Sequence, residues 1–171
     1  MRAVRFAFLA LPVLAIASCS GKDPLNPGTP IGTFRVDGKL VSNACGAAES
    51  APDPWEFDVK LSRDHGTVYW VQGGPPAAGE LDPQNHTIMH TSVENTIHEA
   101  DPKSGLGFCA IERDDTLDVT FNQPITSFAG VLTYAFRPTD GSDCSDQTTA
   151  GGGSFAALPC SVVYTLSGTL Q

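Results

Sequence analysis

The stretch PWEFDVKLS, residues 54–62, alternates apolar and polar side chains. Its apolar side chains share one side of an extended chain: Trp55, Phe57, Val59 and Leu61. Because successive side chains of a β-strand point to opposite faces, this pattern predicts a strand with one buried face. The same period of two recurs along most of the sequence, and it decides the fold class.

Further strands are predicted where this alternation recurs, at residues 67–71, 86–93, 128–136 and 162–170. Two other alternating segments contain short turn signals. Asp37-Gly38 makes residues 33–42 either one strand or a tight hairpin, and the hairpin is favoured. Asp114-Asp115 predicts a second hairpin within residues 108–121. The segment TSVENTIHEA, residues 91–100, is compatible with one or two helical turns.

Residues 32–171 are predicted to form a single all-β domain. No segment of this region shows a persuasive helical period, and eight to ten short strands separated by Gly, Pro and Asp turns are typical of all-β folds. We expect an antiparallel β-sandwich, with a small closed β-barrel as the alternative.

The first 18 residues carry a different signal. Arg2 and Arg5 precede an uncharged, mostly apolar run from Phe6 to Ala17. A membrane-spanning helix needs about 20 apolar residues, whereas the apolar part of a secretory signal has about 7–15. Residues 1–18 are therefore predicted to be a signal peptide that is removed.

The end of this segment, Ile16-Ala17-Ser18-Cys19, resembles the lipobox of bacterial lipoprotein precursors: an aliphatic residue, two small residues and a cysteine. The resemblance implies that the Cys19 sulfur receives a diacylglyceryl group, that the chain is cut before Cys19 and that the new amine is acylated. Two or more acyl chains anchor a protein stably. Ser20 in place of an aspartate favours the outer membrane, on its periplasmic or surface face. An ordinary secretory signal with Cys19 as a spare thiol is the alternative.

Residues 19–31 are predicted to be a tether between this anchor and the domain. Pro24, Pro27 and Pro30 recur at every third position, which favours a polyproline II conformation. At about 3.1 Å per residue, such a segment would hold the domain roughly 30 Å from the membrane.

The chain is acidic, with 10 Lys and Arg against 19 Asp and Glu. Arg2 and Arg5 fall in the predicted signal, which holds no acid, so eight basic residues remain and residues 19–171 carry a formal charge of −11. This charge argues against a nucleic-acid partner, because such binding depends on neutralising phosphates. The expected partners are the membrane, through the lipid, and an envelope protein.

With Cys19 assigned to the lipid, Cys45, Cys109, Cys144 and Cys160 remain. An even number of cysteines in an exported chain predicts disulfides. Of the three possible pairings we favour Cys144–Cys160, which closes a short loop, together with Cys45–Cys109. The isolated cysteines form no C-x-x-C motif and suit a zinc site poorly, so no metal or other cofactor is predicted.

The histidines cluster at His86, His90 and His98, with Glu94 between them. On one strand His86 and His90 would lie roughly 13 Å apart at about 3.3 Å per residue, too far to share a metal. A helix would bring His90, Glu94 and His98 together, but the intervening residues are poor helix formers. Exposed strand positions are therefore expected.

Three further groups of residues are candidates for metal binding or catalysis. The segment Asp140–Asp146 is rich in oxygen ligands, as calcium prefers, but lacks the EF-hand spacing, so an ordinary polar turn is expected. Asp114, Asp115 and Asp118 are expected at a hairpin tip and an outward strand position, with a paired-carboxylate site as the alternative. Ser154 falls one residue short of G-x-S-x-G. No catalytic residue is predicted.

Four aromatic residues could line a groove for a sugar or an apolar ligand: Trp55, Tyr69, Trp70 and Tyr134. Core packing is the favoured interpretation for Trp55 and Tyr134. Tyr69 and Trp70 are adjacent on one strand, so their side chains should point in opposite directions.

The leading functional hypothesis is therefore a membrane-anchored, non-enzymatic envelope lipoprotein that acts as a structural or binding module. Two alternatives come from other classes. One is a lipocalin-like carrier with a ligand cavity inside a closed barrel, and the other is an envelope hydrolase that uses paired carboxylates. An apolar cavity of several hundred Å³ would favour the carrier.

Overall fold

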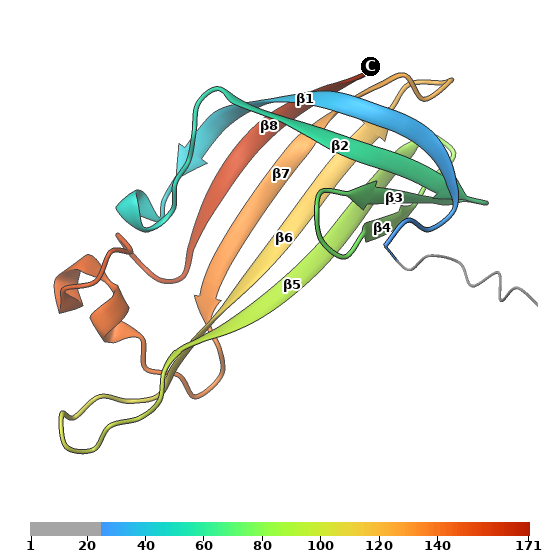
Figure 1. The fold of residues 1–171 in the computed structure, drawn as a ribbon. Coiled ribbons are helices and arrows are strands. Elements are labelled where there is room, and N and C mark those ends of the chain that lie inside the picture. The colour runs from blue at the N-terminus through green and yellow to red at the C-terminus, as the bar shows by residue number, and fades with distance from the viewer. Residues whose placement is uncertain (1–24) are drawn as a thin grey trace, which may run out of the picture.

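A computed structural model describes residues 25–171, so the predicted signal peptide, Cys19 and the first part of the predicted tether, up to residue 24, lie outside the described residues. Eight strands form one antiparallel sheet (Figure 1). In chain order they are β1 (Thr29–Asn43), β2 (Trp55–Asp64), β3 (Thr67–Val71), β4 (Ala77–Glu80), β5 (His86–His98), β6 (Cys109–Phe121), β7 (Ser127–Pro138) and β8 (Cys160–Leu170). Short 3-10 turns lie at Gly46–Ala48, Ser145–Gln147 and Thr149–Gly151.

The strand order is β4-β3-β2-β1-β8-β7-β6-β5, so the first strand pairs with the last. The sheet curls until its two edge strands, β4 and β5, lie against each other (Figure 1). Gly79 on β4 makes this approach possible, because a methyl group there would overlap Oγ1 of Thr87 and come within 3.0 Å of the Ile88 carbonyl oxygen on β5. The result is a nearly closed barrel whose seam is formed by side-chain packing.

The two ends of the barrel differ. Short turns at residues 65–66, 81–85 and 122–126 lie at the end where β1 begins, which we call the turn end. The longer connections at residues 44–54, 99–108 and 139–159, and the 72–76 connection, lie at the opposite end, which we call the loop end. Because every ladder is antiparallel, this division holds for all eight strands.

The core fills the turn end of the barrel. Alternate residues of every long strand point inward, and those near the turn end are almost fully buried: Phe34, Val59, Val119, Phe121 and Phe128. Phe128 contacts Phe34, Phe121 and Trp70 with ring centroids 5.4–5.8 Å apart. These aromatic contacts leave that part of the interior solidly packed.

The predicted all-β, antiparallel and disulfide-braced class is confirmed. Of the two architectures considered, the single nearly closed sheet corresponds to the barrel. Both architectures bury every second side chain, so alternation alone does not separate them. The strands predicted at residues 55–62 and 67–71 are present, and β1 begins at Thr29, inside the predicted tether.

Both predicted hairpins are wrong, because β1 and β6 each run straight through the turn signal. Gly38 pairs with Trp55 on one side and Leu166 on the other. A Cβ atom at position 38 would lie 3.2 Å from the Trp55 carbonyl oxygen. The glycine therefore allows a close approach of neighbouring strands rather than a turn. The helical turns considered for residues 91–100 are also absent, since β5 continues to His98.

The favoured disulfide pairing is wrong as well: the bonds are Cys45–Cys160 and Cys109–Cys144. Cys45 follows β1 and Cys160 begins β8, and these strands are paired neighbours up to Asn43 opposite Val162. Cys109 begins β6, and Cys144 follows the strand beside it, β7. Strand pairing decided the partners, whereas sequence distance pointed to a local loop.

The seam gives a direct test of barrel closure. Gly79→Ala should lower the free energy of unfolding by about 1–3 kcal/mol, because the added methyl group forces β4 and β5 apart. Gly66→Ala is the matched control, since a Cβ atom there meets nothing within 4 Å. Urea titrations of both variants measure the effect. Equal stabilities would show that the two edge strands do not need this contact.

Candidate functional site

The barrel interior changes character toward the loop end. Inward positions of β6 run from Phe121 through Val119 and Leu117 to Asp115 and Arg113, so two charged side chains interrupt the apolar series before it resumes at the buried Ile111 and Cys109. On the neighbouring strand β7, Tyr134 occupies the inward position beside them. The candidate site is built around this charged group.

The larger cavity, about 610 Å³, lies between the 72–76 connection, β5, β6 and β7. Apolar side chains make up most of its wall: Trp70, Ala77, Met89, Leu117 and Leu132. Polar groups face it at Thr91, Arg113, Asp115 and Tyr134. A mostly apolar wall with a few convergent polar groups is typical of small-molecule sites.

A smaller cavity of about 330 Å³ lies beside the 44–54 connection. Its wall combines aromatic rings, including Trp55 and Tyr164, with the carboxylate of Glu49. Arg113 and Tyr134 line both cavities, so the two spaces meet at this pair of side chains.

Arg113 and Asp115 form an ion pair inside the barrel. Nη2 of Arg113 donates a 2.8 Å hydrogen bond to Oδ2 of Asp115. Nε of Arg113 also lies 2.8 Å from Oδ1 of Asp115, but its N–H is not aligned with that oxygen, so these two buried atoms form no hydrogen bond. The pair is therefore only partly satisfied at its buried side, while the Arg113 side chain as a whole stays 42% exposed toward the cavities.

Tyr134 completes this group. The guanidinium of Arg113 lies 5.2 Å from the centre of the Tyr134 ring, within the range of a cation–π contact. Burial, reinforced by the charge of Asp115, raises the pKa of Tyr134 to about 12. The phenol is therefore neutral at physiological pH and can donate a hydrogen bond.

The carboxylates around Arg113 are held in a poorly solvated environment. Burial raises the pKa of Asp115 above its usual range, although the hydrogen bond from Arg113 acts in the opposite direction. Partial burial likewise raises the pKa of Glu49, against the attraction of Arg113. Both groups therefore bind protons more readily than exposed carboxylates do.

Three of the four aromatic candidates belong to the site. Trp55 and Tyr134 line the smaller cavity, and Trp70 and Tyr134 line the larger one. Trp55 also packs on Phe57 and Tyr164, with ring centroids 4.4 and 5.0 Å apart, so it serves the core as well. Tyr69 lies next to the buried Trp70 on β3 and lines neither cavity.

The histidines lie away from these two cavities, and His90 lines a separate, open hollow beside Asp114 and Thr116. Nε2 of His86 is 2.8 Å from Oδ1 of Asp118, and Nδ1 of His90 is 3.1 Å from the hydroxyl of Thr116. The hydrogen bond with Asp118 raises the pKa of His86 above its usual range. These contacts lie on the outer face of β5 and β6, where exposed strand histidines were expected.

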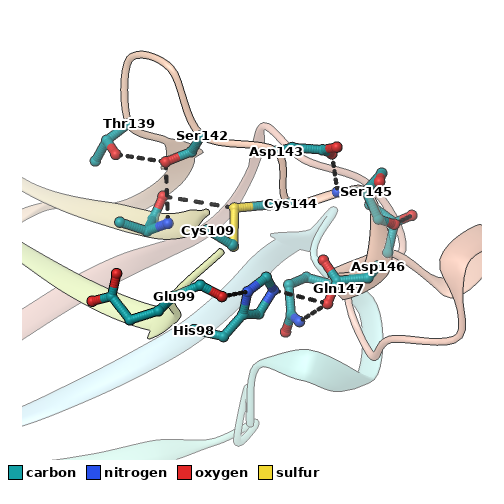
Figure 2. The surroundings of a disulfide bond; sticks show 12 residues. His98, Glu99, Cys109, Thr139, Ser142, Asp143, Cys144, Ser145, Asp146 and Gln147 are labelled. Atoms are coloured by element: carbon teal, nitrogen blue, oxygen red, sulfur yellow. Dashed lines mark hydrogen bonds and ion pairs between the residues drawn. A yellow bond between two sulfur atoms is a disulfide. The ribbon is translucent and has the colours of Figure 1, made fainter. Parts of the chain in front are cut away.

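Figure 2 shows the contacts of the acidic segment Asp140–Asp146, for which an ordinary polar turn was expected. Asp146 lies 3.1 Å from Nε2 of His98 and accepts a hydrogen bond from the side chain of Gln147, while Asp143 accepts one from the backbone of Ser145. His98, Cys109 and Asp146 place ligand atoms within 4.8 Å of one another. The Cys109 sulfur is bonded to Cys144, however, so this cluster contains no free thiolate. The contacts fasten the 139–159 connection to β5.

The other acidic candidates separate. Asp114 points outward and lies 3.1 Å from Nη2 of Arg137, and Asp118 contacts His86, whereas Asp115 alone enters the barrel. Ser154 lies in the 139–159 connection, where the only helical segments are 3-10 turns. A nucleophile elbow requires a strand-to-helix turn in an α/β sheet, which this connection does not provide.

Sequence reasoning missed Arg113 and Glu49. The signal for Arg113 was present, because the inward series Phe121, Val119 and Leu117 reaches positions 115 and 113 if the strand is continuous. The predicted hairpin at Asp114-Asp115 interrupted that series. Glu49 lies in an irregular connection, and only the fold places it beside Arg113.

No protein-family model and no curated protein matches this chain. Within residues 25–171, no helix is long and apolar enough to cross a membrane.

The raised pKa of Asp115 sets the sign of a pH effect. The folded protein holds a proton on Asp115 at pH values where the unfolded chain has lost it, so the ionisation of Asp115 lowers the free energy of unfolding as pH rises from about 4. The free energy of unfolding of the wild type, minus that of Asp115→Asn, should therefore fall steadily as pH rises from about 4 to about 7. Urea titrations at several pH values measure it.

The control for this titration is Asp118→Asn, which alters the outward carboxylate of the same strand beside His86. A wild-type free energy of unfolding that rises with pH relative to that of Asp115→Asn would contradict the burial of Asp115.

Proposed function

We propose that the barrel is a binding module that holds a small molecule at its loop end. The two cavities have volumes of about 610 and 330 Å³, and ligand sites typically measure about 300–1,000 Å³. Their walls offer apolar surface for the body of a ligand and a few polar groups that would fix its orientation. This arrangement supports the carrier-like form of the binding hypothesis.

The observation that carries the proposal is the partly satisfied Arg113–Asp115 pair inside the barrel. Asp115 is mostly buried and Arg113 half-buried, and replacing such a pair by well-packed apolar side chains is often neutral or stabilising, so the pair is weak evidence for a role in stability. The turn end of the same barrel shows the alternative, because equivalent inward positions there hold Val119 and Phe121 in a dry core. Charged groups facing a cavity are better explained by recognition of a ligand.

The side chains at the cavities favour binding over catalysis. Arg113 and a phenol with a pKa of about 12 are poorly suited to exchanging protons near neutral pH. Of the two carboxylates, Glu49 lines the smaller cavity and Asp115 the larger, with Arg113 common to both. The guanidinium therefore partly neutralises both carboxylates. An acid–base hydrolase would need two carboxylates that are free to exchange protons.

The proposed location is the outer membrane of a bacterial envelope, through a lipid on Cys19. The start of β1 lies at the turn end (Figure 1). The cavities lie toward the loop end. A chain tethered through residues 19–28 would then present the ligand site on the side of the barrel away from its anchor. The two disulfides suit an oxidising compartment.

The ligand site is tested with the neutral fluorescent probe N-phenyl-1-naphthylamine. The wild-type protein should bind it saturably with one molecule per chain, because the larger cavity offers apolar surface. Thr91→Trp should weaken binding at least tenfold, since Thr91 faces that cavity. Thr120→Trp is the control, because Thr120 is exposed on the outer face of β6. An unsaturable signal, or equal affinities of the wild type and Thr91→Trp, would refute the site.

The anchor is tested by expressing the full chain in a bacterial host and measuring the intact mass of the membrane fraction. The mature protein should begin at Cys19 and carry a diacylglyceryl group and one further acyl chain. Cys19→Ala should release the domain from the membrane fraction. A mature wild-type chain with an unmodified Cys19 would contradict the anchor.

A further inference from the structure

We propose that the ligand is an organic cation, with an amine or quaternary ammonium group on an apolar or aromatic body, and that Glu49 and the aromatic wall beside it receive the positive charge. This inference rests on the proposed function and names its ligand class. It follows from the charges that face the cavities, from the way Arg113 is engaged, and from the rings that surround them.

The charges at the two cavities do not balance. Three of the side chains that line them carry a formal charge when ionised: Glu49, Arg113 and Asp115. Two carboxylates therefore face one guanidinium. A cationic ligand would neutralise the remaining carboxylate, whereas an anionic ligand would add a third negative charge to a poorly solvated space.

Arg113 is already engaged by groups of the barrel itself. It donates to Asp115 through Nη2, keeps Nε against the same carboxylate and lies over the ring of Tyr134. An anionic ligand would meet a guanidinium whose charge is already offset by Asp115. Glu49 lacks a comparable partner: its side chain faces the smaller cavity, and Arg113 attracts it through space without a hydrogen bond between them.

The connection that carries Glu49 is held in place by the strand before it. Oδ1 of Asn43 accepts hydrogen bonds from the backbone N–H groups of Cys45 and Gly46, and its amide donates to the carbonyls of Gly46 and Glu49. The Cys45–Cys160 bond ties the same connection to β8. The carboxylate is thus presented by an anchored segment, as recognition of a fixed charge requires.

The wall around Glu49 suits a cation. Trp55, Tyr134 and Tyr164 line the same cavity, and Trp55 lies within 6.3 Å of both tyrosine rings, centroid to centroid. Aromatic faces attract cations, and ammonium ligands are held in this way between several rings. Arg113 shows the interaction within the barrel, since its guanidinium already occupies the face of Tyr134.

The electrostatic field of the whole protein also favours a cationic ligand. Residues 19–171 carry a formal charge of −11, which raises the local concentration of cations and lowers that of anions. The raised pKa values of Glu49 and Asp115 add a measurable consequence. A bound cation favours the ionised carboxylates, so binding should release protons at mildly acidic pH.

The test displaces N-phenyl-1-naphthylamine with three small probes that share a benzyl group: benzyltrimethylammonium, benzyl alcohol and phenylacetate. Benzyltrimethylammonium should displace the dye at concentrations at least tenfold lower than either of the others. Calorimetry of the same cation at about pH 5 in buffers of different ionisation enthalpy should detect proton release. Equal potency of the three probes, or preference for phenylacetate, would overturn the inference.

Glu49→Gln should weaken benzyltrimethylammonium binding about tenfold and leave the affinity for the neutral dye unchanged. Glu56→Gln is the matched control, because Glu56 lies on the outer face of β2 and pairs with Arg35. Asp115→Asn provides a second carboxylate variant and should also weaken the cation selectively. Unchanged cation affinity in both cavity variants would overturn the inference.

The dye separates this inference from the proposed function. Saturable dye binding without a preference for the cation would refute the ligand class and leave the binding site standing. Failure of the dye and of all three benzyl probes to bind the wild type would refute the binding site itself.

Discussion

The pairing of β1 with β8 is the constraint on which the rest of this structure depends. It runs from Phe34 opposite Leu170 to Asn43 opposite Val162, and it joins the first strand of the chain to the last. Without it, the strands would form two separate meanders, β1 to β4 and β5 to β8. With it, one sheet is long enough to curl until β4 meets β5, and an interior is enclosed. The same pairing brings Cys45 to Cys160, so this disulfide secures an arrangement that the ladder has already made.

In the curled sheet, the inward side chains of each strand have two roles, which depend on their position between the turn end and the loop end. Inward positions near the turn end hold Phe121 and Phe128, whose rings pack together and leave a dry core. Inward positions of the same strands near the loop end hold Arg113 and Tyr134, which face open cavities. The stability of the core allows the charged group to be tolerated further along the strands. The site therefore lies where charged and polar side chains replace the apolar residues at the inward positions of these strands.

This division explains which features were predictable from the sequence. The class of fold was predictable because a period of two, as in residues 55–62, is a local property of an extended chain. The two hairpins were not, because Asp37-Gly38 and Asp114-Asp115 have turn chemistry that long-range pairing overrides. The error at Asp114-Asp115 also hid the site, since Arg113 and Asp115 are recognisable as inward residues only on an unbroken strand. Disulfide pairing and the placement of Glu49 depend on which strands become neighbours, and the local pattern holds no information on that.

The arrangement of the two ends connects the site to the rest of the chain. The antiparallel up-and-down order places every longer connection at the loop end and the start of β1 at the turn end. Any attachment made through the N-terminal segment therefore acts on the packed end of the barrel, and the cavities lie toward the other. The 44–54 connection, which lines the smaller cavity, is fastened by the Cys45–Cys160 bond. The 139–159 connection is fastened by Cys109–Cys144 and by His98–Asp146. A connection that is cross-linked to the barrel loses less conformational entropy when it becomes ordered. The Cys45–Cys160 bond therefore helps the irregular 44–54 connection to form a defined wall beside the charged group. Both disulfides lie at the loop end, beyond the strand residues that line the cavities.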